Sequence, residues 1–138
     1  MSRSSRVIPP ITAQLIRPGV VEVRIVARIY GQAGEHWRRV LSGPNHGGYG
    51  RILIDRTEAK QRRYENCYDS RDDYRGNPAI NLDECPGAMF IWTGDKEADV
   101  EAICAVDNQK LGRELGNALR PYPQRTRKDL WEVVFRFL

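Results

Sequence analysis

The stretch "VVEVRIVARIY" at residues 20–30 constrains the fold more than any other, because apolar and polar side chains alternate along it. A period of two is typical of a β-strand with one face on the core and the other in water. The inward set is Val21, Val23, Ile25, Ala27 and Ile29, and the outward set is Glu22, Arg24, Val26, Arg28 and Tyr30. A sheet with one wet face is therefore the expected framework.

Further apolar patterns predict how this sheet is completed. Residues 37–42 and 49–55 flank the turn sequence "GPNHGG" and are expected to pair as a hairpin. The closing segment at 129–138 alternates clearly and predicts a strand. Residues 88–94 also predict a strand, and residues 95–106 fit either a helix or, in preference, a strand that forms a hairpin with them.

Helices are expected to be few. Leucines recur at helical spacing within residues 107–123. Residues 56–68 can form a second, weaker helix, whereas residues 69–87 have the composition of a long polar loop. The predicted class is α+β, with a mostly antiparallel sheet of about five to six strands and one or two helices, the clearer helix near the C-terminus.

The length and the prolines indicate the domain organisation. At 138 residues, the chain is expected to form one domain. Pro9, Pro10 and Pro18 exclude a helix at the N-terminus and disfavour a central strand there. We therefore expect an extended, proline-containing N-terminal arm at 1–19 and a single α+β domain at 20–138.

Hydropathy and cysteine usage indicate a cytoplasmic protein with no membrane partner. No apolar run approaches the ~18 residues of a membrane span, and the basic first ten residues lack the apolar core of a signal peptide. Cys67, Cys85 and Cys104 include no CxxC pair, so neither a disulfide framework nor a zinc cluster is expected. We expect these cysteines to be small apolar residues in or near the core.

Charge is distributed along the chain in opposing blocks. The net charge of +4 combines +8 over residues 1–63 (12 basic, 4 acidic), −8 over residues 64–107 (3 basic, 11 acidic) and +4 over residues 108–138 (7 basic, 3 acidic). Such blocks neutralise each other within the fold, meet between copies of the chain, or meet a charged partner.

Arginine accounts for 18 of the 22 basic residues, and its planar guanidinium suits contacts with phosphate, carboxylate and aromatic groups. A sheet face with arginines and aromatic side chains is one way to hold single-stranded nucleic acid. The same face can equally meet the acidic block of a neighbouring protein. The predicted binding residues are Arg24, Arg28, Tyr30, Arg38, Arg39, Arg51, Arg56, Arg62 and Arg63.

These features predict a non-enzymatic binding or assembly protein that docks its partner electrostatically through the arginine-rich face. The expected partner is a protein, either another copy of the chain or a different protein, and nucleic acid is the alternative. The opposed charge blocks favour a protein. The small size, the arginine content and the lack of an enzyme motif also suit a phage or mobile-element product.

The competing hypothesis is a small nuclease or other phosphate-handling enzyme that uses His36, His46 and Arg51. Histidines serve as general acid and base, and an arginine stabilises the charge of a phosphorane. In the predicted hairpin, His46 lies at the turn and His36 at the far end, about 20 Å away. That separation is too large for both histidines to serve one phosphate unless the strands bend.

Other catalytic and cofactor patterns fail. Gly43 and Gly48 have the spacing of a phosphate-binding P-loop, but Tyr49 and Gly50 replace the Lys and Ser or Thr that contact phosphate and metal. The acidic loop at 69–77 fails as an EF-hand, because Arg71 and Tyr74 stand at its third and sixth positions counted from Asp69. A solvated loop is therefore favoured over a looser calcium or magnesium site. We therefore expect no metal and no cofactor.

Overall fold

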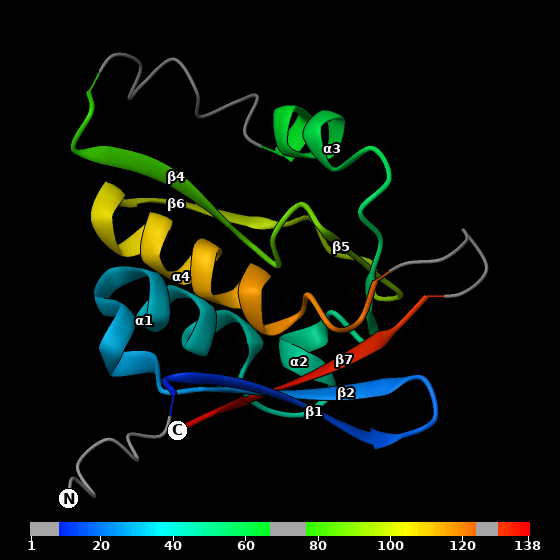
Figure 1. The fold of residues 1–138 in the computed structure, drawn as a ribbon. Helices are drawn as coiled ribbons and strands as arrows, with labels where there is room; N and C mark the ends of the chain where they lie inside the picture. The colour runs from blue at the N-terminus through cyan, green and yellow to red at the C-terminus, as the bar shows by residue number, and fades with distance from the viewer. Residues whose placement is uncertain (1–8, 67–76, 124–129) are drawn as a thin grey trace, which may run out of the picture.

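The computed structural model describes residues 9–66, 77–123 and 130–138. Within them the chain forms a five-stranded mixed sheet and a separate two-stranded sheet, with two long helices between the sheets (Figure 1). All strand pairings except one are antiparallel in this part of the chain. The structure therefore confirms the predicted α+β class and the mostly antiparallel sheet.

The five-stranded sheet has the order β1-β2-β7-β3-β5. β1 (Ile11–Arg17) and β2 (Val20–Ile25) form an antiparallel hairpin, and β7 (Glu132–Phe137) runs parallel to β2. β3 (Ile52–Ile54) lies between β7 and β5 (Phe90–Trp92), antiparallel to both. Part of the segment predicted as an N-terminal arm is thus the edge strand β1.

One face of this sheet carries the hydrophobic core. β2 buries Val21, Val23 and Ile25, as its period of two predicts, and β7 buries Val133 and Phe135 in the same way. The intervening residues of both strands form the wet face of the sheet, which borders the candidate site described below.

Two helices cover the apolar face. α1 (Gly31–Leu41) contributes Trp37, whose ring packs edge-on against aromatic rings of the sheet. α4 (Ala105–Ala118) contributes Leu111 and Leu115, one helical turn apart. This helix confirms the predicted helix near the C-terminus. In the described ranges, every helix is too short or too polar to span a lipid bilayer.

The second sheet packs on the other side of these helices. It pairs β4 (Ile80–Cys85) antiparallel with β6 (Asp99–Cys104), and both strands contact α1 and α4. The remaining elements are short: the 3-10 turn η2 (Ala27–Tyr30), the turn α2 (Asn45–Gly48) and the helix α3 (Ala59–Asn66).

The predicted hairpin of residues 37–42 and 49–55 is wrong. The first of these segments continues helix α1, in which Ala33, Trp37 and Leu41 recur every fourth position and are buried together. In a helix this spacing gives one continuous apolar stripe that packs on the sheet. In a strand, the exposed Glu35 and Arg39 would share a face with these buried side chains.

Three other expectations also need correction. β2 ends at Ile25, and the tighter turn η2 directs Tyr30 into the core and not onto the wet face. The predicted loop at 69–87 contains β4, whose residues pair with β6. β6 confirms the strand predicted within 95–106, but it pairs with β4 and not with the strand at 88–94.

Candidate functional site

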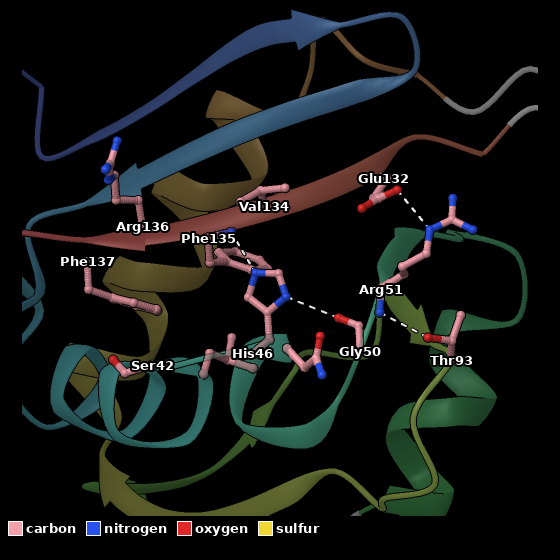
Figure 2. A pocket seen from close by; sticks show the side chains of 13 residues that line it. Ser42, His46, Gly50, Arg51, Thr93, Glu132, Val134, Phe135, Arg136 and Phe137 are labelled. Carbon is pink, nitrogen blue, oxygen red and sulfur yellow. Dashed lines mark hydrogen bonds and ion pairs between the residues drawn. The ribbon is translucent and has the colours of Figure 1, made fainter.

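A cleft opens in the five-stranded sheet beyond the N-terminal end of β3. β3 pairs with β7 only through Ile52 with Val133 and Leu53 with Glu132, whereas β7 stays paired with β2 as far as Phe137. Past Val133, the side of β7 that faces β3 therefore has no strand beside it in the described part of the chain. The resulting cleft has a volume of about 800 Å³. Figure 2 shows the side chains that line it.

The ring of His46 occupies the next position of the β3–β7 ladder. Ile54 N–H donates to Trp131 O at 2.8 Å, and hydrogen-bonded pairs recur every two residues in an antiparallel ladder. After the pair of Ile52 with Val133, the ladder would therefore join Gly50 to Phe135. Instead, Phe135 N–H donates to His46 Nε2 at 3.1 Å, and His46 Nδ1 lies 3.1 Å from Gly50 O (Figure 2). The imidazole bridges the two backbone groups that a longer β3 would join directly.

These two hydrogen bonds fix the tautomer of His46. A backbone N–H only donates, so Nε2 is the acceptor from Phe135, and a carbonyl only accepts, so Nδ1 carries the proton toward Gly50. Both ring nitrogens are thereby engaged with backbone groups. In this arrangement His46 supports the cleft and has no nitrogen left to exchange a proton with a substrate.

The turn that carries His46 has an unusual backbone. Asn45, His46 and Gly47 all have positive φ values, of 53°, 48° and 63°. A left-handed backbone costs about 1–2 kcal/mol per non-glycine residue, and at Gly47 a Cβ would lie 2.1 Å from Val40 O. Strain of this kind is concentrated at binding sites and active sites, which supports a role for the cleft beyond packing.

Backbone groups of β7 point into the cleft. The odd-numbered residues of β7 direct their N–H and C=O groups away from β2, as Phe135 N–H does, whereas Leu138 N–H donates to Ile25 O of β2. Phe135 O and both backbone groups of Phe137 therefore face the cleft, and no strand among the described residues pairs with them. Unpaired strand edges of this kind accept another extended chain.

Two exposed arginines border the cleft. Arg51 Nε donates to Glu132 Oε1 at 2.9 Å, but the Arg51 side chain is still 65% exposed (Figure 2). The Arg136 side chain is 60% exposed, and its Nη1 lies 3.7 Å from Glu22 Oε2. In the register of β2 and β7, Arg136 lies beside Arg24. Since each guanidinium has five N–H donors, both retain donors for the carboxylates of a ligand.

The structure disperses most of the predicted arginine-rich face. Of the predicted residues, only Arg24 and Arg51 lie near the cleft, and Arg28 is exposed on η2. Arg24 itself pairs with Glu22 at 2.7 Å between Nε and Oε1, and the others also bind acidic side chains or backbone carbonyls of the chain. The contacts are Arg38 with Glu35, Arg39 with Glu101, Arg63 with Glu84, Arg56 with the carbonyls of Leu119 and Tyr122, and Arg62 with those of Asp55 and Ala88.

The ion pairs of Arg39 with Glu101 and of Arg63 with Glu84 join the basic N-terminal block to the acidic block at 64–107. The opposing charges of the sequence are thus partly neutralised within the fold. Tyr30, also predicted to face a ligand, is buried and donates its hydroxyl proton to Glu114 at 2.9 Å. Burial, together with Glu114, raises the pKa of Tyr30 well above its usual range.

Arg136 and the edge of β7 were missed by the sequence analysis. The alternation of the closing strand does place Arg136 on the wet face and was a usable signal. The open edge of β7 had no sequence signal, because it depends on which strand lies beside β7 and on where that strand ends.

His36 does not line this cleft; it lies on α1, where it faces β4 and β6. Its ring is fully buried, with Nδ1 2.7 Å from Asp83 Oδ2 and Nε2 2.7 Å from Asp99 Oδ1. Burial by itself would lower the pKa of His36, but the hydrogen bonds to Asp83 and Asp99 and the charge of Glu101 outweigh it and raise the pKa. Of the trio His36, His46 and Arg51, the structure brings only the last two to one cleft.

We expect the free energy of unfolding to fall as the pH rises through the folded-state pKa of His36. The unfolded-state pKa is about 6.5 and the folded-state pKa is higher, so this stabilisation is complete below about pH 6.5 and is lost above it. Urea unfolding in EDTA buffer, from about pH 6 to about pH 9, measures the fall. Asp99→Asn, which removes one of the groups that raise the pKa, should reduce it; an equal fall in both proteins would assign the effect to other groups.

Some of the predicted features lie outside the residues that the structure describes. Cys67 and residues 69–76 of the acidic loop lie outside them, so the roles predicted for Cys67 and for this loop stay predictions. Cys85 is buried, and burial raises the pKa of its thiol. Cys104 is partly buried at the end of β6.

No protein-family model matches this sequence, and no curated protein matches it either. The cleft beside β7 and its chemistry therefore carry the functional conclusion.

Proposed function

We propose that this chain is a protein-docking module that binds an extended segment of a partner protein by β-strand addition to β7. The observation that carries the proposal is the open edge past Val133, where Phe135 O and both backbone groups of Phe137 face a cleft. In β-strand addition, main-chain hydrogen bonds give affinity, and contacts of the flanking side chains give specificity.

The cleft suits a short segment that runs antiparallel to β7, as β3 does. One residue of the segment would exchange two hydrogen bonds with Phe137, and the residue two positions further along would donate its N–H to Phe135 O. The ladder ends there, because Phe135 N–H is already bound to His46. With so few backbone hydrogen bonds available, side-chain contacts must add to the affinity.

The side chains at the rim favour an acidic segment. Arg51 and Arg136 are the exposed cations there, with Arg24 beside Arg136 on the same face. Arginine binds carboxylates through paired N–H donors, and this attraction also accelerates association. A nucleic acid would satisfy the arginines too, but it lacks the repeated amide donors and acceptors that match a strand edge.

Selection from a random peptide library tests the proposal and supplies a probe. The selected peptides should combine β-branched residues with Asp or Glu, because they must be extended and must meet the arginines. Replacement of Arg51 and Arg136 together by glutamate should weaken the binding of such a peptide at least about tenfold, since attraction becomes repulsion. Arg113→Glu makes the same kind of charge change on an exposed position of α4 and should leave the affinity close to that of the wild type.

Amide hydrogen exchange measures the docking geometry separately from the affinity. The bound peptide should slow exchange of the Phe137 amide, because that N–H becomes a donor in the new ladder. Failure to select any peptide, or a selected peptide that leaves Phe137 exchange unchanged, would refute docking at β7. Co-purified nucleic acid that high salt releases would point to the alternative partner.

A further inference from the structure

A second group of polar side chains converges between α1, β4 and β6, away from the docking cleft. His36 comes from α1, Asp83 from β4, and Asp99 and Glu101 from β6. The alternation of β6 places Asp99 and Glu101 on one face, and the register sets Asp83 opposite Glu101. Segments far apart in the sequence thus gather one imidazole and three carboxylates.

The imidazole of His36 is held in a fixed orientation by a buried carboxylate. Asp83 is 5% exposed, its Oδ2 lies 2.7 Å from His36 Nδ1, and its Oδ1 accepts the indole N–H of Trp37 at 3.2 Å. A metal-binding histidine commonly donates one ring N–H to a carboxylate, which leaves the other nitrogen as the ligand. Asp83 has this relation to His36, and Nε2 therefore points toward Asp99 and Glu101.

Three ligand atoms meet at this point. His36 Nε2 lies 2.7 Å from Asp99 Oδ1 and 3.7 Å from Glu101 Oε2, and all three atoms lie within 4.8 Å of one another. A divalent ion that binds nitrogen and oxygen at about 2.0–2.2 Å needs ligand atoms roughly 3–4 Å apart. The carboxylates are accessible, at 49% and 39% side-chain exposure, so an ion can approach from solvent although the ring is buried.

We propose that His36 Nε2, Asp99 and Glu101 bind one divalent transition-metal ion, with Zn²⁺ as the best match. One imidazole and two carboxylates suit Zn²⁺ or Mn²⁺, whereas Ca²⁺ and Mg²⁺ prefer sites made of oxygen alone. Three protein ligands leave a coordination position for water, as in catalytic zinc sites and unlike closed structural ones. The pocket beside the cluster, between α1 and β6, gives that water access to solvent.

Two cations compete with the ion for these ligands. One is the proton that His36 Nε2 donates to Asp99, and the other is Arg39, whose guanidinium pairs with Glu101. Metal binding displaces the proton, so the affinity should increase with pH. It also requires Arg39 to release Glu101, whereas the negative charges of Asp83, Asp99 and Glu101 all favour the ion. Arg39→Ala should therefore bind the ion several-fold more tightly than the wild type.

Isothermal titration of the folded protein with ZnCl₂, and separately with MnCl₂, tests the site. We expect one ion per chain, with Asp99→Asn and Glu101→Gln each lowering the affinity at least about tenfold, because each removes one ligand charge. Asp95→Asn and Glu97→Gln make the same changes at exposed positions just before β6 and should bind as the wild type does. Circular dichroism verifies that each variant is folded.

Nitrogen NMR gives a readout that does not depend on affinity, because the ion should shift the resonance of His36 Nε2 more than that of Nδ1. Failure of the wild type to bind either ion at every pH from about 6 to about 9, a range that extends well above the usual pKa of histidine, would overturn the proposal. Equal binding by the Asp99 and Glu101 variants would also overturn it, since the ion would then sit on other groups such as the cysteines. Peptide docking at β7 is measured independently, so either proposal can fail alone.

Discussion

Asp83→Ala should lower the free energy of unfolding by about 3–5 kcal/mol, which is the cost of removing one partner from a buried charged pair. Asp83 is buried, and its two carboxylate oxygens accept from the rings of His36 and Trp37. Alanine would leave both ring N–H groups in the interior without their acceptor. Because His36 and Trp37 come from α1 and Asp83 from β4, the loss also loosens the contact between helix and second sheet.

Urea unfolding followed by far-ultraviolet circular dichroism measures this loss. Asp95→Ala removes an exposed carboxylate and should change the free energy by less than about 0.5 kcal/mol. Asp83→Asn keeps the size and one acceptor oxygen, so its loss should fall between the two. A loss below about 1 kcal/mol for Asp83→Ala would mean that water replaces the carboxylate, and the orientation of His36 would then need another explanation.

The strands that alternate over their whole length were predictable from the sequence. β2 and β7 each have one face on the core and one in water, and a strand in that position must alternate. In the sequence the alternation continues beyond β2 as far as Tyr30. In the structure the strand ends at Ile25, and the turn η2 follows it. A period of two continued by chance through a turn with three residues per turn, and the face of Tyr30 was predicted wrongly.

Helix α1 was missed because its first turn contains Gly31 and Gly34, which are weak helix formers. Tertiary packing stabilises the helix, because its apolar stripe, with Trp37 and Leu41, packs against the sheet. Because residues 37–42 were predicted to be a strand, His46 was predicted to lie at the tip of a hairpin. The structure places it instead in the turn α2 that follows helix α1.

Neither candidate site was predictable in full, because both depend on contacts between distant segments. The docking cleft exists because β7 lies between β2 and β3, so that Arg136 stands beside Arg24 and the short β3 leaves part of β7 unpaired. The group around His36 requires β4 to pair with β6, whereas the composition of the β4 residues predicts a loop. Composition identified the relevant residue types, arginine and carboxylate, but not which of them meet.

Gly34→Ala should lower the free energy of unfolding by about 2–3 kcal/mol, the range expected when a core is overpacked against backbone. Helix propensity alone predicts the opposite sign, since alanine in a helix is favoured over glycine by about 1 kcal/mol. The position decides between the two effects: a Cβ on Gly34 would lie 1.9 Å from Ala27 O and 2.8 Å from Ala27 C. These are backbone atoms of η2, so no side-chain rotation relieves the overlap, and α1 must shift.

Gly112→Ala is the matched control, because Gly112 lies within helix α4 and nothing stands within 4 Å of the added Cβ. There propensity acts alone, and the variant should be more stable than the wild type by about 0.5–1 kcal/mol. Chemical denaturation of both variants gives free-energy changes of opposite sign. A shift of α1 would also move His36 away from Asp83, so Gly34→Ala should weaken Zn²⁺ binding whereas Gly112→Ala should not. Two stabilised variants would show that α1 does not approach η2 as closely as 1.9 Å implies.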